Sequence, residues 1–156
     1  MATKPQTGEK LIASNKKALH EYFIVQKFEA GLALTGTEVK SLRDGKAQLK
    51  DAYVTFNDGE AFLYGAHISP YSHGNLQNHE PERSRKLLLH RKEIDKLRVQ
   101  TVEKGLTIVP LRLYFKGSRV KAEIAIVRGK KQHDKRETEK TREADREVAQ
   151  AMKSRR

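Results

Sequence analysis

The sequence contains no cysteine among its 156 residues, which excludes disulfide bonds and every zinc site that depends on thiolate ligands. The absence of thiols also fits a reducing cytosol. The first residues, MATKPQTG, lack the apolar segment of a secretory signal, and no run approaches the ~18 apolar residues that a membrane helix needs. We therefore expect a soluble, cytoplasmic protein that has no membrane partner.

Motifs of catalysis are missing as well. Gly31 and Gly36 have the glycine spacing of a phosphate-binding P-loop, but Thr37 stands where that motif has its lysine, and Glu38 stands where it has a hydroxyl residue. The histidines form no HExxH pair, and neither a GxSxG elbow nor a cysteine nucleophile is present. We predict no enzyme, no metal and no cofactor, and only the ordinary abundance of acidic residues leaves an enzyme as a third alternative.

Positive charge is what the sequence has in excess. Lysine and arginine total 32 against 20 aspartate and glutamate residues, which gives a net charge of +12 and a pI near 9.9. Such an excess favours a polyanionic partner, with nucleic acid ahead of an anionic membrane surface. The basic residues gather in three clusters, formed by Lys40, Arg43 and Lys46, by 83–98, and by 129–136. Because such side chains neutralise phosphates, RNA is the predicted ligand.

Residue patterns predict short strands and few helices. Aromatic and β-branched residues over 20–28 indicate a strand, and the runs 52–56 and 60–64 around an Asp-Gly turn indicate a hairpin. Residues 106–115 and 120–127 indicate two more strands joined by a tight turn, with one face carrying Val109, Leu111, Leu113 and Phe115. Helices are expected over 37–43, capped by Thr37, and over 90–105, whereas 69–82 should form a loop.

These elements predict a mainly β protein, a small OB-fold-like barrel of about six strands with two or three added helices. Pattern alone leaves an SH3-like barrel or an open α+β sheet as alternatives. We expect a flexible N-terminus over 1–14, an RNA-binding barrel over 15–132, and a basic tail over 133–156.

The tail has its own composition. Residues 128–156 hold 11 Lys or Arg and 6 Asp or Glu but no aromatic residue, so they cannot bury enough apolar surface to order alone. A narrow apolar stripe at helical spacing nevertheless predicts a helix that forms on a partner, through Ala144, Val148, Ala151 and Met152.

Three blocks resemble the SsrA-binding protein family, also called small protein B. They read FEAGLALTGTEVKSLR over 28–43, RKLLL over 85–89 and GKKQHDKR over 129–136. The resemblance runs from about Asn15 to the C-terminus. It implies an OB-fold and a function in trans-translation: the protein binds transfer-messenger RNA at its tRNA-like part and delivers it to stalled ribosomes. There it takes the place of the missing codon–anticodon region, with its tail helical in the decoding centre and message channel of the small subunit.

The resemblance also implies roles for single residues. Glu29 and Leu88 match positions important for RNA binding, and His90 stands where the family often has asparagine. The predicted phosphate contacts are Lys40, Arg43, Arg85 and Lys86, argued from charge as much as from the family. The positions near the ribosomal decoding site are Lys130, Lys131, His133, Asp134, Lys135, Arg136 and Met152. We expect a monomer; the alternative function is that of a ribosome-associated general RNA-binding protein or RNA chaperone.

Overall fold

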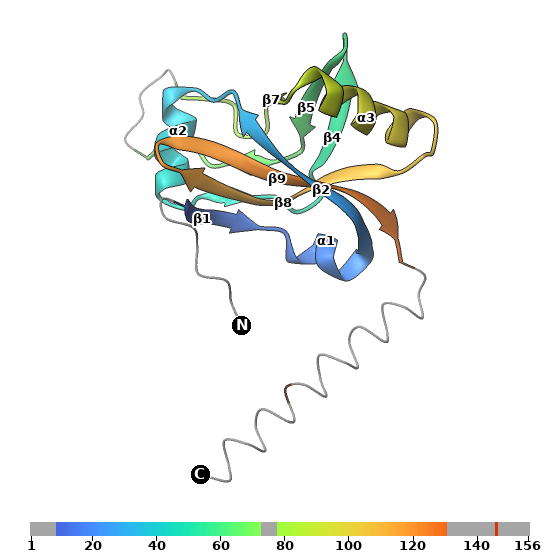
Figure 1. The fold of residues 1–156 in the computed structure, drawn as a ribbon. Coiled ribbons are helices and arrows are strands. Elements are labelled where there is room, and N and C mark those ends of the chain that lie inside the picture. Colours follow the sequence, from blue (N-terminus) through green and yellow to red (C-terminus); the bar gives the residue numbers. More distant parts are fainter. Residues whose placement is uncertain (1–8, 73–77, 131–145, 147–156) are drawn as a thin grey trace.

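Antiparallel strands dominate the part of the chain that this computed structural model describes, residues 9–72, 78–130 and 146 (Figure 1). In chain order its elements are β1 (Glu9–Ser14), α1 (Lys16–Glu21), β2 (Tyr22–Leu32), α2 (Gly36–Arg43), β3 (Ala47–Gln48), β4 (Tyr53–Asn57), β5 (Glu60–Tyr64), β6 (His67–Ile68), β7 (Arg85–Leu88), α3 (Arg91–Val102), β8 (Thr107–Lys116) and β9 (Arg119–Gly129).

One curled sheet carries most of these strands. Seven of them follow the order β1-β8-β9-β2-β7-β5-β4, and β3 and β6 form a separate pair. The sheet bends so far that β4 packs against β8, yet the ladder pairings of the described strands do not close into a ring. The prediction of a mainly β protein with two or three added helices is confirmed, and the barrel is an open one.

The core fills the concave side of this sheet. Val120, Ala122, Ile124 and Ile126 all point into it from one face of β9, as their alternation predicted. On β8 the prediction that Val109, Leu111, Leu113 and Phe115 share one face is wrong. A β-bulge between Pro110 and Arg112 adds one residue and reverses the alternation, so only the later pair on that face reaches this core. The earlier pair, Val109 and Leu111, packs in a second cluster under Ala18 of α1.

The N-terminal segment is more ordered than predicted. Residues 9–14 form β1, which pairs with β8, so the expected looseness is wrong for them; residues 1–8 lie outside the described residues. Helix α1 was not predicted. Buried Asn15 caps it by accepting from the Ala18 N–H at 3.1 Å, and its side-chain amide donates to the carbonyl oxygen of Pro110 at 2.9 Å.

Local signals located the other elements well. The β4–β5 hairpin turns at Asp58 and Gly59, which both have the positive φ that a tight hairpin turn requires. The β8–β9 hairpin is confirmed, and α3 lies inside the predicted range, with His90 at its N-cap. Helix α2 begins at Gly36 with Thr35 as its N-cap, two residues before the predicted Thr37, and the Thr35 N–H donates to Glu38 Oε1 at 2.8 Å.

Candidate RNA-binding surface

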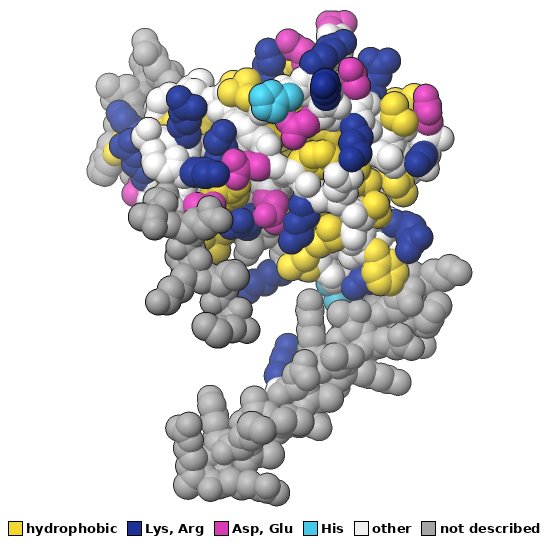
Figure 2. Space-filling view, viewed as in Figure 1, with side chains coloured by type: hydrophobic (Ala, Val, Ile, Leu, Met, Phe, Trp, Pro, Cys, Tyr) yellow, Lys and Arg dark blue, Asp and Glu magenta, His cyan; other side chains and the backbone are white. Residues whose placement is uncertain are grey.

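A groove of about 600 Å³ opens where β2, β7 and the start of α3 meet. Figure 2 shows an exposed histidine on this side of the molecule, with hydrophobic, acidic and basic side chains around it. Four of the predicted RNA-binding residues line the groove, namely Glu29, Lys86, Leu88 and His90. Lys86, Leu88 and His90 follow one another closely in β7 and at the N-cap of α3. Glu29 lies far from them in sequence, and the pairing of β2 with β7 brings it to the same groove.

The Leu88 side chain lies over Gly31, in space that any larger residue at position 31 would occupy. Gly31 of β2 pairs with Leu88 of β7, and a Cβ at Gly31 would lie 3.2 Å from the Leu88 Cβ. The Leu88 side chain is 52% exposed, and a second hollow of about 430 Å³ borders it on the other side. An exposed leucine between two hollows is a surface for an apolar contact, not a core residue.

Glu29 is held as an ionised acceptor at the edge of the groove. The Tyr114 hydroxyl donates to Glu29 Oε2, and Lys116 Nζ lies 3.4 Å from Oε1. The hydrogen bond from Tyr114 lowers the pKa of Glu29 below its ordinary value; partial burial opposes the shift, and Lys116 adds to it. The carboxylate remains partly exposed, so it can accept hydrogen bonds from a ligand.

Tyr114 is buried and packs against Arg112, and the sequence analysis did not identify it as a site residue. Its side chain is 2% exposed, and the Arg112 guanidinium carbon lies 4.4 Å from the ring centroid. Arg112 in turn pairs with Glu123 at 3.2 Å. A tyrosine within a strand pattern predicts only a packing role. The fold is needed to show that the Tyr114 hydroxyl reaches Glu29.

Removing that hydroxyl gives a first prediction. In Tyr114→Phe the pKa of Glu29 should rise, because the bond that favours the ionised carboxylate is lost. NMR titration of the Glu29 carboxyl carbon measures the pKa directly. The matched control is Tyr64→Phe, an exposed tyrosine on β5, which should leave the titration unchanged. An unshifted Glu29 in Tyr114→Phe would show that the tyrosine does not control the carboxylate.

Lys86 and His90 complete the groove. Lys86 Nζ pairs with Glu60 at 2.9 Å on an exposed surface, so a phosphate can compete for it. His90 is exposed at the N-cap of α3, and its backbone N–H donates to Glu93 Oε1 at 3.1 Å. The imidazole is therefore presented at the end of a helix, where it can stack or hydrogen-bond.

Lys40 and Arg43 lie on α2 and do not line the groove. Both are exposed, and Lys40 Nζ lies 5.6 Å from the ring centroid of Tyr71. Arg43 borders a separate hollow with Lys10 and Phe115. Their role as phosphate contacts stays a prediction, at a place distinct from Glu29 and Leu88.

Arg85 is buried, unlike the other predicted phosphate contacts. Its side chain is 0% exposed, and its Nε donates to Glu38 Oε2 at 2.5 Å. The two terminal nitrogens donate to the carbonyl oxygens of Ala66 and Pro81, each at 2.9 Å. The prediction of a phosphate contact is wrong for this residue, because its guanidinium is enclosed and fully engaged inside the protein.

The predicted decoding-site residues fall largely outside the described residues, which include Lys130 but not Lys131, His133, Asp134, Lys135, Arg136 or Met152. The Lys130 backbone N–H donates to the Glu21 carbonyl oxygen at 2.9 Å, and its Nζ lies 5.3 Å from the Phe23 ring centroid. Lys130 therefore lies beside the end of α1 and the start of β2.

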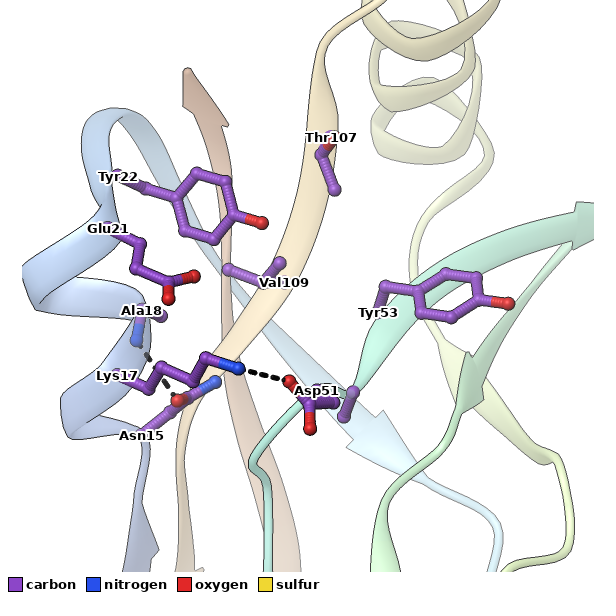
Figure 3. Close-up of a pocket in the computed structure, with 10 residues that line it drawn as sticks. Asn15, Lys17, Ala18, Glu21, Tyr22, Asp51, Tyr53, Thr107 and Val109 are labelled. Atoms are coloured by element: carbon purple, nitrogen blue, oxygen red, sulfur yellow. Dashed lines mark hydrogen bonds and ion pairs between the residues drawn. The ribbon is translucent and has the colours of Figure 1, made fainter. Parts of the chain in front are cut away.

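A smaller pocket, of about 200 Å³, lies between α1 and β4 (Figure 3). Lys17 Nζ and Asp51 Oδ1 pair across it at 2.6 Å, and Glu21, Tyr22 and Tyr53 line it. None of the predicted RNA-binding residues contributes to it. Within the described ranges no group of three acidic or histidine side chains is placed to hold a metal ion, and no helix there is long and apolar enough to span a membrane.

Comparisons with known proteins agree with the resemblance seen in the sequence. The family model described as "SmpB protein" matches residues 12–154. The SsrA-binding protein of Pelobacter propionicus is 60% identical over 147 residues, which cover 94% of this chain and 97% of that protein. The SsrA-binding protein of Geobacter sulfurreducens is 56% identical over 146 residues, covering 94% and 95%. A solved structure described as "tmRNA-SmpB: a journey to the center of the bacterial ribosome" superposes with a TM-score of 0.66 at 45% identity, covering 77% of this chain and 85% of that one.

Proposed function

The chain belongs to the SmpB protein family, and from this premise we propose that it binds transfer-messenger RNA and brings it to stalled ribosomes in trans-translation. The observation that carries the proposal is the near full-length identity to SsrA-binding proteins, since SsrA RNA is transfer-messenger RNA. The large positive charge suits an RNA adaptor. A function on ribosomes implies that the protein works in the cytoplasm.

We propose the groove as the site for the tRNA-like part of that RNA. Glu29 accepts hydrogen bonds from a base or a sugar hydroxyl, and Leu88 packs against a nucleoside in the hollow beside Gly31. His90 stacks or hydrogen-bonds, and Lys86 exchanges Glu60 for a phosphate. Such a mixture of shape and polarity gives specificity that a uniformly basic surface lacks.

In this proposal the tail, residues 133–156, binds the ribosome while the groove binds the RNA. Residues 133–156 enter the decoding centre and message channel of the small ribosomal subunit, fold there into a helix, and stand in for the absent codon–anticodon pairing. The support is the apolar stripe in a segment otherwise too polar to fold alone, together with the family match, which extends to residue 154.

Charge alone supports the alternative of a general RNA chaperone, and a groove variant separates the two. Glu29→Ala combined with Leu88→Ala should weaken binding of transfer-messenger RNA at least tenfold, about 1.4 kcal/mol, because both direct contacts are lost. Binding is measured by gel shift, and circular dichroism checks that the fold survives.

The matched control removes the same chemical groups elsewhere. Val102→Ala with Glu103→Ala deletes one exposed aliphatic side chain and one exposed carboxylate at the far end of α3, and should bind like wild type. Equal affinity of the groove variant and this control would show that the net charge, not the groove, carries RNA binding.

A further inference from the structure

Two carboxylates lie directly opposite each other in the β2–β9 ladder, at the edge of the groove. Glu29 of β2 and Glu123 of β9 are cross-strand partners, and Arg112 of β8 is the partner of Glu123 on its other side. The three strands lie side by side in the sheet (Figure 1). Directly paired residues of antiparallel strands share one face, where like charges repel each other. The fold must therefore compensate these two charges.

Glu123 is compensated by two cations. Arg112 Nε donates to Glu123 Oε2 at 3.2 Å, and Arg112 Nη2 lies 3.2 Å from the same oxygen. Lys27 Nζ lies 3.8 Å from Glu123 Oε1, and Glu9 Oε2 lies 4.0 Å from Arg112 Nη1. Lys27 is exposed, whereas the contact with Arg112 is shorter and partly buried. Because water screens an exposed pair more strongly, Arg112 contributes most of the compensation.

Glu29 keeps its own partners and stays available to a ligand. Its side chain is 41% exposed and lines the groove, whereas that of Glu123 is 20% exposed and does not line it. The guanidinium of Arg112 also covers the ring of Tyr114, whose hydroxyl donates to Glu29. Arg112 thus contacts both the carboxylate that opposes Glu29 and the tyrosine that holds it.

We propose that Arg112 is a positioning residue of the RNA-binding groove, which binds Glu123 and thereby prevents this second carboxylate from repelling Glu29 and the incoming RNA. The proposal rests on the groove function proposed above and extends it to residues that do not line the groove. Without Arg112, Glu123 would be an uncompensated negative charge beside Glu29. Such a charge disfavours the ionised form of Glu29 and opposes an approaching phosphate.

Arg112→Met isolates the charge of this side chain, because methionine is also long and unbranched and can pack on the Tyr114 ring. NMR titration of the full-length variant should show a raised pKa of the Glu29 carboxyl group, since the released Glu123 repels it. Gel shift at about 200 mM salt should show about fivefold or weaker binding of transfer-messenger RNA. Circular dichroism checks that the variant is folded.

Removing the second charge should restore both quantities. Arg112→Met combined with Glu123→Gln has no carboxylate at position 123, so the pKa of Glu29 should return to its wild-type value and the affinity to within about twofold. Arg112→Lys keeps a cation and should show the same recovery. A pair that only stabilised the sheet would not give this pattern, because the double variant lacks the ion pair altogether.

Arg98 provides the matched control for net charge. It is exposed on α3 and does not line the groove. Arg98→Met removes one positive charge, and Arg98→Met with Glu103→Gln matches the double variant. Both should bind within about twofold of wild type and leave the pKa of Glu29 unchanged. Equal effects of the two arginine substitutions, an unmoved Glu29 pKa in Arg112→Met, or a double variant that fails to recover would each overturn the proposal.

The groove variant Glu29→Ala with Leu88→Ala separates a failure of this proposal from a failure of the proposed function. If that variant binds transfer-messenger RNA like wild type, the groove is not the RNA site, and the role of Arg112 falls with it. If the groove variant loses affinity while Arg112→Met keeps it, the proposal for Arg112 is wrong and the groove function is untouched.

Discussion

Replacing Glu38 by alanine is expected to lower the free energy of unfolding by about 3–5 kcal/mol, the usual cost of leaving a buried charge without its partner. Glu38 and Arg85 are both 0% exposed and pair at 2.5 Å between α2 and β7. Arg83 pairs with the other Glu38 oxygen at 2.6 Å, and that oxygen also accepts from the Thr35 N–H. Without the carboxylate, Arg85 would remain enclosed with an uncompensated charge.

Urea unfolding followed by circular dichroism measures the loss. Glu38→Gln keeps the volume and one acceptor, so it should lose less and still fold where Glu38→Ala does not. The control is Glu103→Ala, an exposed carboxylate, with an expected change below about 0.5 kcal/mol. A Glu38→Ala protein as stable as this control would mean that the pair contributes nothing to folding.

The same pair gives the protein a predicted acid sensitivity. Burial alone would raise the pKa of Glu38, but the hydrogen bonds from Arg83, from the Thr35 N–H and from Arg85 lower it below the ordinary value. A group with a lowered folded-state pKa stabilises the protein above its unfolded-state pKa and loses that contribution as the pH falls through the folded-state value. The stability gap between wild type and Glu38→Gln should therefore be full near pH 7 and shrink in acid, below about pH 4.

Deleting residues 133–156 should leave the affinity for transfer-messenger RNA within about tenfold, or ~1.4 kcal/mol, of wild type but abolish peptide tagging on stalled ribosomes. The groove lies wholly in the described part of the chain and needs no tail residue. Gel shift measures the first quantity, and a translation reaction programmed with a message that lacks a stop codon measures the second.

A shuffled tail is the matched control for that deletion. It keeps the length, composition and charge of residues 133–156 but breaks the apolar stripe of Ala144, Val148 and Met152. Tagging should fail with the shuffled tail as it does with the deletion. Full tagging by either protein, or loss of RNA affinity well beyond tenfold, would contradict the division of work between groove and tail.

The elements that the sequence predicted well depend on local chemistry. The Asp58–Gly59 turn and the alternation on β9 act within a few residues, so a pattern is enough to find them. The bulge at Pro110–Arg112 is different, because a single extra residue exchanges the two faces of β8. Pro110 inside the strand run was the one sequence signal of this bulge, since proline in a strand is typical of bulges and edges.

Contacts between distant residues account for the errors in the predicted site. In the sequence Arg85 lies between Arg83 and Lys86 and cannot be told from them as a surface charge. Its burial depends on Glu38, 47 positions away. One local signal was present: in a strand, Arg85 and Leu87 share a face, so Lys86 and Leu88 must share the other. Tyr114 reaches Glu29 across 85 positions, and only the sheet order brings them together.

Discrimination between RNAs tests the central claim most directly. Wild-type protein is titrated by gel shift against transfer-messenger RNA and against an ordinary tRNA, at about 50 mM and about 200 mM salt. We expect a strong preference for transfer-messenger RNA that persists at the higher salt, because in our proposal the groove recognises shape and polar groups as well as phosphate. Equal binding of the two RNAs that collapses together with salt would contradict the account and leave only the positive charge as the source of affinity.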